Sequence, residues 1–268
     1  MPGKNTYIYN LNFFDIENEF SFYWAGFIAA DGCVSKKGDF HLSLKLSDKH
    51  HIEKFKEHVQ TNAPIKYKPP TKKVINNVQT ITSGTSLIRF RAKNWSTSLQ
   101  KFNIVPNKTK TFNIPEHIKN NQLFKHFIRG YFDGDGWFSL RNFKNKQRLS
   151  WGLCGNYDVL KTVQEYLQEN CKIKKLPKII KQNTIYKFEF QNQQDIKNIV
   201  DFLYSNTNVY LDRKYELSKL ITNLSKTNYR LNLDPQKLKE LYKTYNSYKK
   251  LAEHLNVSVG AINKYINL

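Results

Sequence analysis

The sequence predicts an α+β fold made of two pseudo-symmetric αββαββα repeats, followed by a small C-terminal helical region. Three observations predict it. A short apolar run ending in Asp-Gly occurs twice, at residues 24–32 and 128–136. The same succession of hydrophobic patterns follows each run, and the last part of the chain has a different pattern. The predicted domains are residues 1–112, 113–228 and 229–268.

The first repeat begins with the helical run and continues through alternating segments. Residues 40–47 alternate between apolar and polar side chains, which predicts a half-buried strand. A helix follows, with Ile52, Phe55 and Val59 at helical spacing. The Pro/Lys-rich residues 66–73 indicate a loop or an irregular hairpin. The remaining predicted elements are a strand at 87–91 and a helix at 94–102.

The second repeat has the same order. Its predicted elements are a hairpin at 137–141 and 148–154, a helix at 157–170, a strand at 184–190, and helices at 195–204 and 213–224. The two repeats join near residues 111–121, which contain Pro115. Because the strands of each repeat are neighbours in sequence, antiparallel pairing is expected.

The tail reads as a separate helical unit. Asp234-Pro235 is typical of a helix start. In residues 247–266 two short helices flank a tight turn at Asn256–Val257, which resembles a helix-turn-helix. The second helix, residues 258–266, would then enter the major groove of DNA, with Ser258, Asn263 and Lys264 as contact residues. The alternative is an ordinary helical tail that packs on the core.

Composition favours a nucleic-acid partner inside the cell. The formal net charge is +21 and the isoelectric point is about 9.7, which suits a polyanion. A lysine-rich solvated surface is the alternative. The three cysteines are scattered, so neither a disulfide framework nor a zinc site is expected. No apolar run has membrane-spanning length, and no secretory signal is expected.

The small residues of the two runs predict a close contact between two helices. Gly26 and Ala30 are four residues apart, as are Gly130 and Gly134, so each pair shares one helix face. Small side chains there let two helix backbones approach closely.

The two aspartates, Asp31 and Asp135, would then lie together at the helix C-termini. Gly32 and Gly136 occupy the positions where glycine ends a helix. Two carboxylates at the negative ends of helices repel each other and the helix dipoles. A divalent cation relieves both effects, and hard oxygen ligands suit Mg²⁺. This predicts a metal-dependent phosphodiesterase. The alternative is that each Asp-Gly is an ordinary helix-ending turn.

The paired runs resemble the signature of the LAGLIDADG homing endonucleases in their single-chain, two-repeat form, over residues 18–225. The resemblance implies a saddle of antiparallel sheets over DNA. It assigns the catalytic metals to Asp31 and Asp135, with the backbone carbonyls of Ala30 and Gly134. The implied metal is Mg²⁺, with Mn²⁺ able to substitute and Ca²⁺ binding without supporting cleavage.

Several positions depart from the family pattern. The sixth motif position, which is not a metal ligand in the family, is Ala29 in the first run and Asp133 in the second. Trp24 and Arg129 depart at less critical positions. These differences indicate two halves that have diverged, and they do not affect the expected metal ligands.

The resemblance also implies further catalytic residues. Lys108 and Lys214 match lysines that lie near the active-site waters, where they stabilise charge or activate water; otherwise they are surface charges. Asp48 and Asn156 match polar residues that orient solvent at the end of each second strand; otherwise they are helix caps. The outward strand residues expected to contact DNA are Ser35, Lys37, His41, Ser43, Lys45, Arg89, Arg91, Trp137, Ser139, Arg141, Arg148, Ser150 and Lys187.

The expected activity is hydrolysis of both strands of a long, nonpalindromic double-stranded DNA site, leaving short 3′ overhangs. The protein is expected to act as a monomer, inside the cell and with no membrane. Two alternatives of the same fold stay open. One is a DNA-binding regulator without catalytic activity, and the other is an intron RNA maturase.

Overall fold

A computed structural model describes residues 7–75, 78–108, 111–143, 146–222, 235–255 and 259–266 of the chain. The chain divides into two compact units, residues 1–135 and 136–268. Within the described ranges, no helix combines the length and the apolar character that crossing a membrane requires.

The first unit contains one four-stranded antiparallel sheet and its helices. The elements in order are α1 (Glu19–Asp31), β1 (Gly32–Val34), β2 (Asp39–Lys45), η1 (Leu46–Asp48), α2 (Lys49–His58), β3 (Ile65–Lys68), β4 (Lys72–Ile75), β5 (Val78–Ile81), β6 (Thr85–Arg91), α3 (Lys93–Ser98), η2 (Leu99–Phe102), α4 (Glu116–Lys119) and α5 (Phe124–Asp135). The strand order is β1-β2-β6-β3.

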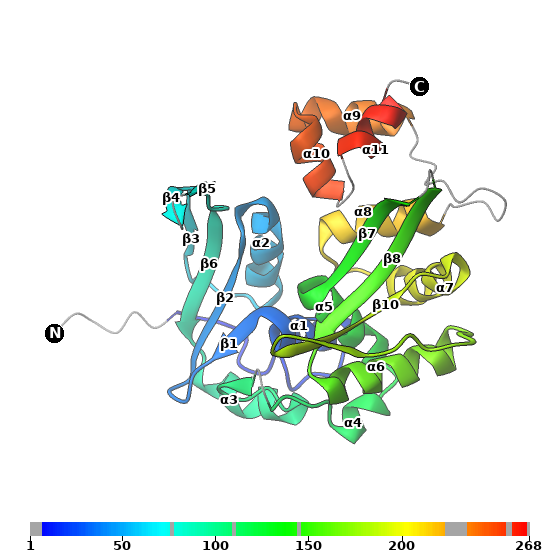
Figure 1. Ribbon diagram of the computed structural model, residues 1–268. Helices are drawn as coiled ribbons and strands as arrows, with labels where there is room; N and C mark the ends of the chain where they lie inside the picture. The colour runs from blue at the N-terminus through cyan, green and yellow to red at the C-terminus, as the bar shows by residue number, and fades with distance from the viewer. Residues whose placement is uncertain are drawn as a thin grey trace. The chain divides into compact units, whose positions relative to one another are not determined.

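The predicted alternation in β2 and β6 is confirmed. Phe40, Leu42 and Leu44 of β2 are buried, and Ile88 and Phe90 of β6 lie on the same side of the sheet. Helix α2 packs against both strands on this side, which leaves the other side of the sheet open (Figure 1). The sheet therefore buries its aromatic and aliphatic residues on one face and presents its polar residues on the other.

The expectation of a loop or irregular hairpin at residues 66–73 is only partly correct. This stretch contains β3, which joins the four-stranded sheet, and β4, which pairs with β5 in a separate two-stranded ribbon. Thr71 and Thr82 join the base of the ribbon, where the amide of Thr82 donates to the carbonyl of Thr71. Pro69 and Pro70, which cannot donate to a ladder, separate β3 from β4.

The second unit is built on the same plan. Its elements are β7 (Gly136–Phe143), β8 (Lys146–Gly155), α6 (Tyr157–Asn170), β9 (Ile180–Gln182), β10 (Ile185–Phe190), α7 (Gln193–Tyr204), α8 (Asp212–Thr222), α9 (Pro235–Tyr245), α10 (Tyr248–Leu255) and α11 (Val259–Ile266). The strand order is β7-β8-β10-β9, all antiparallel. Helices α6 and α7 pack on the sheet (Figure 1). The helix predicted at 157–170 has those bounds.

The three C-terminal helices pack on one another. Leu238 of α9, Leu251 and Leu255 of α10, and Ile262 of α11 are buried. Helix α10 also contacts α8. Two short helices are thus present where the sequence predicts a helix-turn-helix. The predicted turn at 256–257, the predicted helix start at Asp234 and the predicted contact residue Ser258 lie outside the described residues.

The motif helix of the second repeat, α5, belongs to the first compact unit because it packs along α1. The first unit therefore holds both motif aspartates. The repeat boundaries given in the sequence analysis stay predictions.

Candidate active site

Helices α1 and α5 pack through the small residues that the sequence singles out. A Cβ on Gly26 would lie 2.0 Å from the carbonyl oxygen of Phe127, and one on Gly130 would lie 1.9 Å from that of Tyr23. Any side chain at either position would enter the backbone of the opposite helix. The predicted glycine contact is therefore confirmed, and it sets the spacing of the two helices.

The contact brings the motif aspartates to the same end of the helix pair. Asp31 and Asp135 are the last residues of α1 and α5. A Cβ on Gly134, the residue before Asp135, would lie 2.4 Å from Ala30 Cβ and 3.4 Å from Asp31 Oδ2. Asp31 is exposed and Asp135 is half-buried. Both carboxylates are thus available near one point.

Helix α1 ends at the predicted glycine, but by a different geometry. The amide of Gly32 donates to the carbonyl of Ile28, yet Gly32 is extended (φ −84°, ψ 158°) and not left-handed. A Cβ on Gly32 would lie 2.7 Å from Ile28 Cγ2. Glycine is required here by close packing as the chain leaves the helix and enters β1.

Lys108 lies beside the two aspartates. Its side chain is 8% exposed, and Nζ donates a hydrogen bond of 2.8 Å to the carbonyl of Gly32. Burial lowers the pKa of Lys108, while the nearby Cys33, Asp135 and Asp31 act in the opposite direction. Lys108 is therefore not a solvated surface charge. It places an ammonium group within the electrostatic reach of both carboxylates.

Lys214 makes the equivalent contact in the second unit. Its side chain is 2% exposed, and Nζ donates a hydrogen bond of 2.6 Å to the carbonyl of Gly136. In each unit, a buried lysine thus holds the carbonyl of the glycine that follows a motif aspartate. This shared contact supports the pairing of Lys108 with Lys214 that the sequence predicts.

Asp48 and Asn156 are less well matched than expected. Each is the N-cap residue of the helix after the second strand, α2 or α6, and neither makes a side-chain capping hydrogen bond. The register of the strands shows that Asp48 and Asn156 are not at equivalent positions. The glycine after the motif pairs with Leu42 in one unit and with Leu153 in the other, so Asn156 corresponds to Lys45 along the strand. The extra turn η1 displaces Asp48, and the predicted match is therefore wrong in register.

Most of the strand residues expected to contact DNA lie on open surface. In the first unit Lys37, Ser43, Lys45, Arg89 and Arg91 are exposed, and Ser35 and His41 are half-buried. Burial lowers the pKa of His41, and the charges of Arg89 and Lys108 lower it further. At neutral pH the side chain of His41 is therefore an uncharged hydrogen-bonding group on a cationic face.

The second sheet differs more from expectation. Arg148 is exposed, and Trp137, Ser139 and Lys187 are half-buried. The expectation of an accessible Ser150 is wrong, since it is 4% exposed. Its strand, β8, is internal between β7 and β10, and the ring of Trp137 lies across Gly152 on the same strand. Among the remaining contact residues, Asn263 is exposed on α11, the side chains of Arg141 and Lys264 are not described, and Ser258 lies outside the described residues.

The sixth motif position has a buried structural role in α5. The hydroxyl of Tyr23 donates to Asp133 Oδ2 at 2.7 Å and lies 3.0 Å from His51 Nε2. All three side chains are buried. The network joins α1, α5 and α2. An acidic residue within an otherwise apolar helical run was the only sequence signal for it.

A second buried group surrounds Arg129, which is fully buried. Its Nη2 donates to Glu19 Oε1 at 2.7 Å, and its Nη1 lies 2.8 Å from His126 Nδ1. The pKa of His126 is lowered to about 4, mainly by burial of the imidazole, and the positive charge of Arg129 lowers it further. In the sequence, Arg129 stands out only as a departure from the family pattern.

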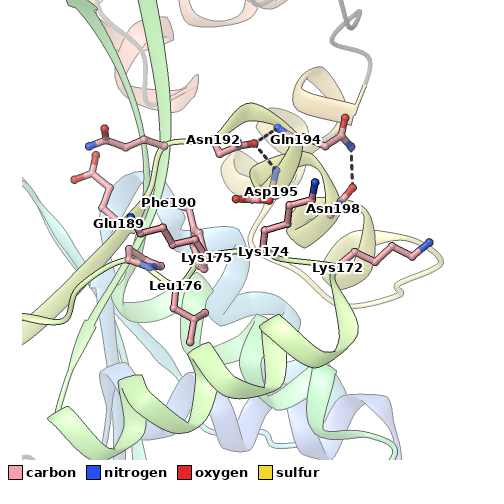
Figure 2. A pocket seen from close by; sticks show the side chains of 12 residues that line it. Lys172, Lys174, Lys175, Leu176, Glu189, Phe190, Asn192, Gln194, Asp195 and Asn198 are labelled. Carbon is pink, nitrogen blue, oxygen red and sulfur yellow. Dashed lines mark hydrogen bonds between the residues drawn. The ribbon is translucent and has the colours of Figure 1, made fainter.

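A pocket of about 490 Å³ lies elsewhere in the second unit. It is formed by the segment after α6, the end of β10 and the start of α7, and Lys172, Lys174 and Lys175 line it (Figure 2). Asn192 accepts hydrogen bonds from the amides of Gln194 and Asp195 at the start of α7 (Figure 2). These amides are therefore already bonded within the protein. No residue of the predicted active site lines this pocket.

The donor chemistry at the motif ends fits a divalent cation. Within the described part of the chain, no group of three or more His, Cys, Asp or Glu side chains gathers as a complete protein ligand set. The site offers two carboxylates, from Asp31 and Asp135, next to backbone carbonyls. Such hard oxygen donors suit Mg²⁺, which commonly binds one or two carboxylates and completes its shell with water and substrate phosphate.

Comparison with known proteins identifies the fold. No family model and no curated protein matches the sequence. Among solved structures, the meganuclease I-SmaMI bound to uncleaveable DNA matches with a TM-score of 0.50 and 15% identity, over 84% of this chain and 97% of that chain. The LAGLIDADG meganuclease I-CpaMI bound to uncleaved DNA matches with a TM-score of 0.51 and 12% identity, over 90% and 98%.

The homing endonuclease I-WcaI bound to its DNA recognition sequence matches with a TM-score of 0.51 and 14% identity, over 72% of this chain and 84% of that chain. The chain therefore has the fold of the single-chain LAGLIDADG homing endonucleases.

Proposed function

We propose that the protein is a metal-dependent, site-specific endonuclease that acts on double-stranded DNA as a single chain. The observation that carries the proposal is the pairing of Asp31 and Asp135 at the ends of two helices, with the buried Lys108 beside them. The likeness of the fold to DNA-bound homing endonucleases supports it.

In this proposal the carboxylates of Asp31 and Asp135, with the carbonyls of Ala30 and Gly134, hold Mg²⁺. When bound, the cation supplies Lewis acidity to the scissile phosphate and its attacking water. The glycine contact between α1 and α5 keeps the two carboxylates together although they repel each other. The surrounding protein thus fixes the ligands before DNA arrives.

Lys108 and Lys214 act in two ways. Each holds a carbonyl at the point where a motif helix passes into its first strand, which fixes the backbone after the metal-binding residue. The ammonium of Lys108 also lowers the electrostatic cost of two neighbouring carboxylates and favours the approach of a phosphate. A substitution at either lysine is therefore expected to affect catalysis more than binding.

The open faces of the two sheets bind the DNA duplex. Exposed arginine and lysine side chains contact phosphates and the edges of guanine bases. Because the residues on the two sheets differ, the recognised site is nonpalindromic. Cleavage of both strands leaves short 3′ overhangs, as in the family that the motifs resemble.

Helices α10 and α11 form a second DNA-binding region in this proposal. Their buried Leu251, Leu255 and Ile262 pack the helices together, and Asn263 of α11 is exposed. An exposed polar residue on the second helix of such a pair is in a position to read a major groove. In this way α10 and α11 would contact DNA beyond the stretch that the two sheets bind.

The test measures cleavage and binding separately. A plasmid that carries the insertion site of the gene, or a site recovered by selection from random DNA, is incubated with the protein and Mg²⁺, Mn²⁺, Ca²⁺ or EDTA. Linear product is expected with Mg²⁺ and Mn²⁺ only. Asp31→Asn and Asp135→Asn are expected to reduce double-strand cleavage by roughly 100-fold or more. DNA affinity should be kept or increased, because an amide does not repel phosphate.

Asp158→Asn, an exposed acid at the start of α6, is the matched control and should cleave normally. Normal cleavage by Asp31→Asn or Asp135→Asn would show that the assigned metal ligands are wrong. Tight binding without cleavage under every metal condition would instead favour the DNA-binding regulator. Stimulated splicing of the intron transcript would favour the maturase.

A further inference from the structure

The open faces of the two four-stranded sheets differ in chemistry. In the first unit, the face away from α2 presents a dense group of exposed cations. They are Lys45 on β2, Lys66 and Lys68 on β3, and Arg89 and Arg91 on β6. The register places all five on one side, together with Ser43 and the half-buried His41.

The second sheet presents an apolar pair on an open face that also carries Lys187, the half-buried Glu189 and the exposed Arg148. Ile180 on β9 is 50% exposed and Ile185 on β10 is 41% exposed. The register sets Ile180 opposite Lys187 and Ile185 opposite Gln182, so the two isoleucines are diagonal neighbours on the same side of the sheet. Side chains at such positions lie within about 7–8 Å of each other and form a common surface.

Two lysines lie near the isoleucine pair. Lys187 lies on the same face, and the exposed Lys178 precedes β9, whereas Lys181 pairs with Tyr186 and lies on the opposite face. A small apolar surface bordered by lysines complements the major groove at thymines, where each C5-methyl group lies between two phosphate backbones. The cations disfavour an ordinary apolar protein partner, because docking would bury their charges without compensation.

We infer that Ile180 and Ile185 are specificity-determining residues that read thymine methyl groups, so the half-site bound by the second sheet is rich in thymine. The cationic face of the first sheet reads a half-site richer in guanine, because arginine and lysine pair with guanine O6 and N7. This inference rests on the proposed function, since it requires that the two open faces bind DNA.

The test replaces thymine by deoxyuridine, which keeps every base-pairing group and removes only the methyl. A site is recovered by selection from random duplex DNA in Ca²⁺, and deoxyuridine is then placed in one half at a time. Affinity is expected to fall roughly fourfold for each contacted methyl group that is removed. This factor corresponds to the free energy gained when one methylene-sized group is buried. The loss should occur in one half only.

Protein variants assign that half to the second sheet. Ile180→Ser and Ile185→Ser should weaken binding to the thymine site and cause no further loss on the deoxyuridine site. Ile8→Ser is the matched control, because Ile8 is 67% exposed and lies on neither sheet. It should bind both sites like the unmodified protein.

Two results would overturn the inference. Equal affinity for thymine and deoxyuridine in both halves, on a site that is still bound and cut, would exclude methyl readout and leave the proposed function intact. A deoxyuridine effect that persists unchanged in both isoleucine variants would assign the methyl contact to other residues. Failure to select any DNA site would reject the proposed function as well.

Discussion

At the scale of single residues, the glycines between α1 and α5 decide how closely Asp31 and Asp135 approach. A Cβ at residue 130 would overlap the carbonyl oxygen of Tyr23, which belongs to backbone and cannot rotate away. Gly130→Ala is therefore expected to push the helices apart. The expected loss of unfolding free energy is about 2 kcal/mol or more, although alanine is the better helix former by about 1 kcal/mol. Urea denaturation measures it.

Gly260→Ala provides the matched control, because a Cβ there meets no atom within 4 Å and the residue lies in α11. This variant should be as stable as the unmodified protein or slightly more so. If Gly130→Ala unfolded at the same urea concentration as the unmodified protein, the close contact between α1 and α5 would not be a feature of the folded protein.

At the scale of elements, Arg129 and His126 of α5 and Glu19 of α1 tie the helix pair together. The pKa of His126 in the folded protein is about 4, below its usual 6.5. Between these values the unfolded chain binds a proton that the folded protein does not. The stability contribution of neutral His126 is therefore present above pH 6.5 and is lost as pH falls toward 4.

His126→Asn keeps an acceptor for Arg129 and removes the titration. Between pH 7 and pH 5, the melting temperature of the unmodified protein is expected to fall by roughly 4–8 °C more than that of the variant, equivalent to about 2 kcal/mol. Other groups titrate in both proteins, so the difference isolates residue 126. Parallel pH profiles, or an NMR titration with the imidazole pKa near 6.5, would contradict the assignment.

Sequence patterns predict elements whose burial follows a regular period. The alternation around Phe40 and Leu42 predicts β2, and the spacing of Val159 and Leu167 predicts α6, because one face of each is buried. The ribbon of β4 and β5 is predicted only in part, as a loop or an irregular hairpin at residues 66–73, because no alternation of apolar and polar residues marks that stretch. The many proline and lysine residues of this stretch are typical of loops, so the sequence does not show that two strands pair there.

The geometry of the site could be predicted from the sequence at positions where only one type of residue fits. Gly26 and Gly130 indicate the helix contact because no larger residue fits. By contrast, the offset between Asp48 and Asn156 arises from the short turn η1, which adds three residues between the end of β2 and the start of α2. Ser150 is buried on β8, which lies between β7 and β10, and the order of the strands in the sheet cannot be read from spacing along the chain.

At the scale of the whole molecule, the net charge is +21, and the C-terminal helical region contributes basic residues such as Lys237, Lys243 and Lys249. If that region binds DNA, affinity and cleavage depend on different parts of the chain. Phosphate and base contacts by α11 would tighten binding, while the chemistry stays with the helix ends of the first unit. The two quantities should therefore respond separately to substitution.

Asn263→Ala tests this separation, because Asn263 is exposed on α11 and its replacement leaves the buried Ile262 in place. Loss of one base or phosphate contact is expected to weaken DNA binding by roughly 5- to 100-fold, or about 1–3 kcal/mol. The single-turnover cleavage rate at saturating protein should not change. Glu240→Gln, an exposed substitution on α9, serves as the control. Equal affinities for both variants and the unmodified protein would show that α11 is not used for DNA, and that the C-terminal helices serve the fold of the second unit.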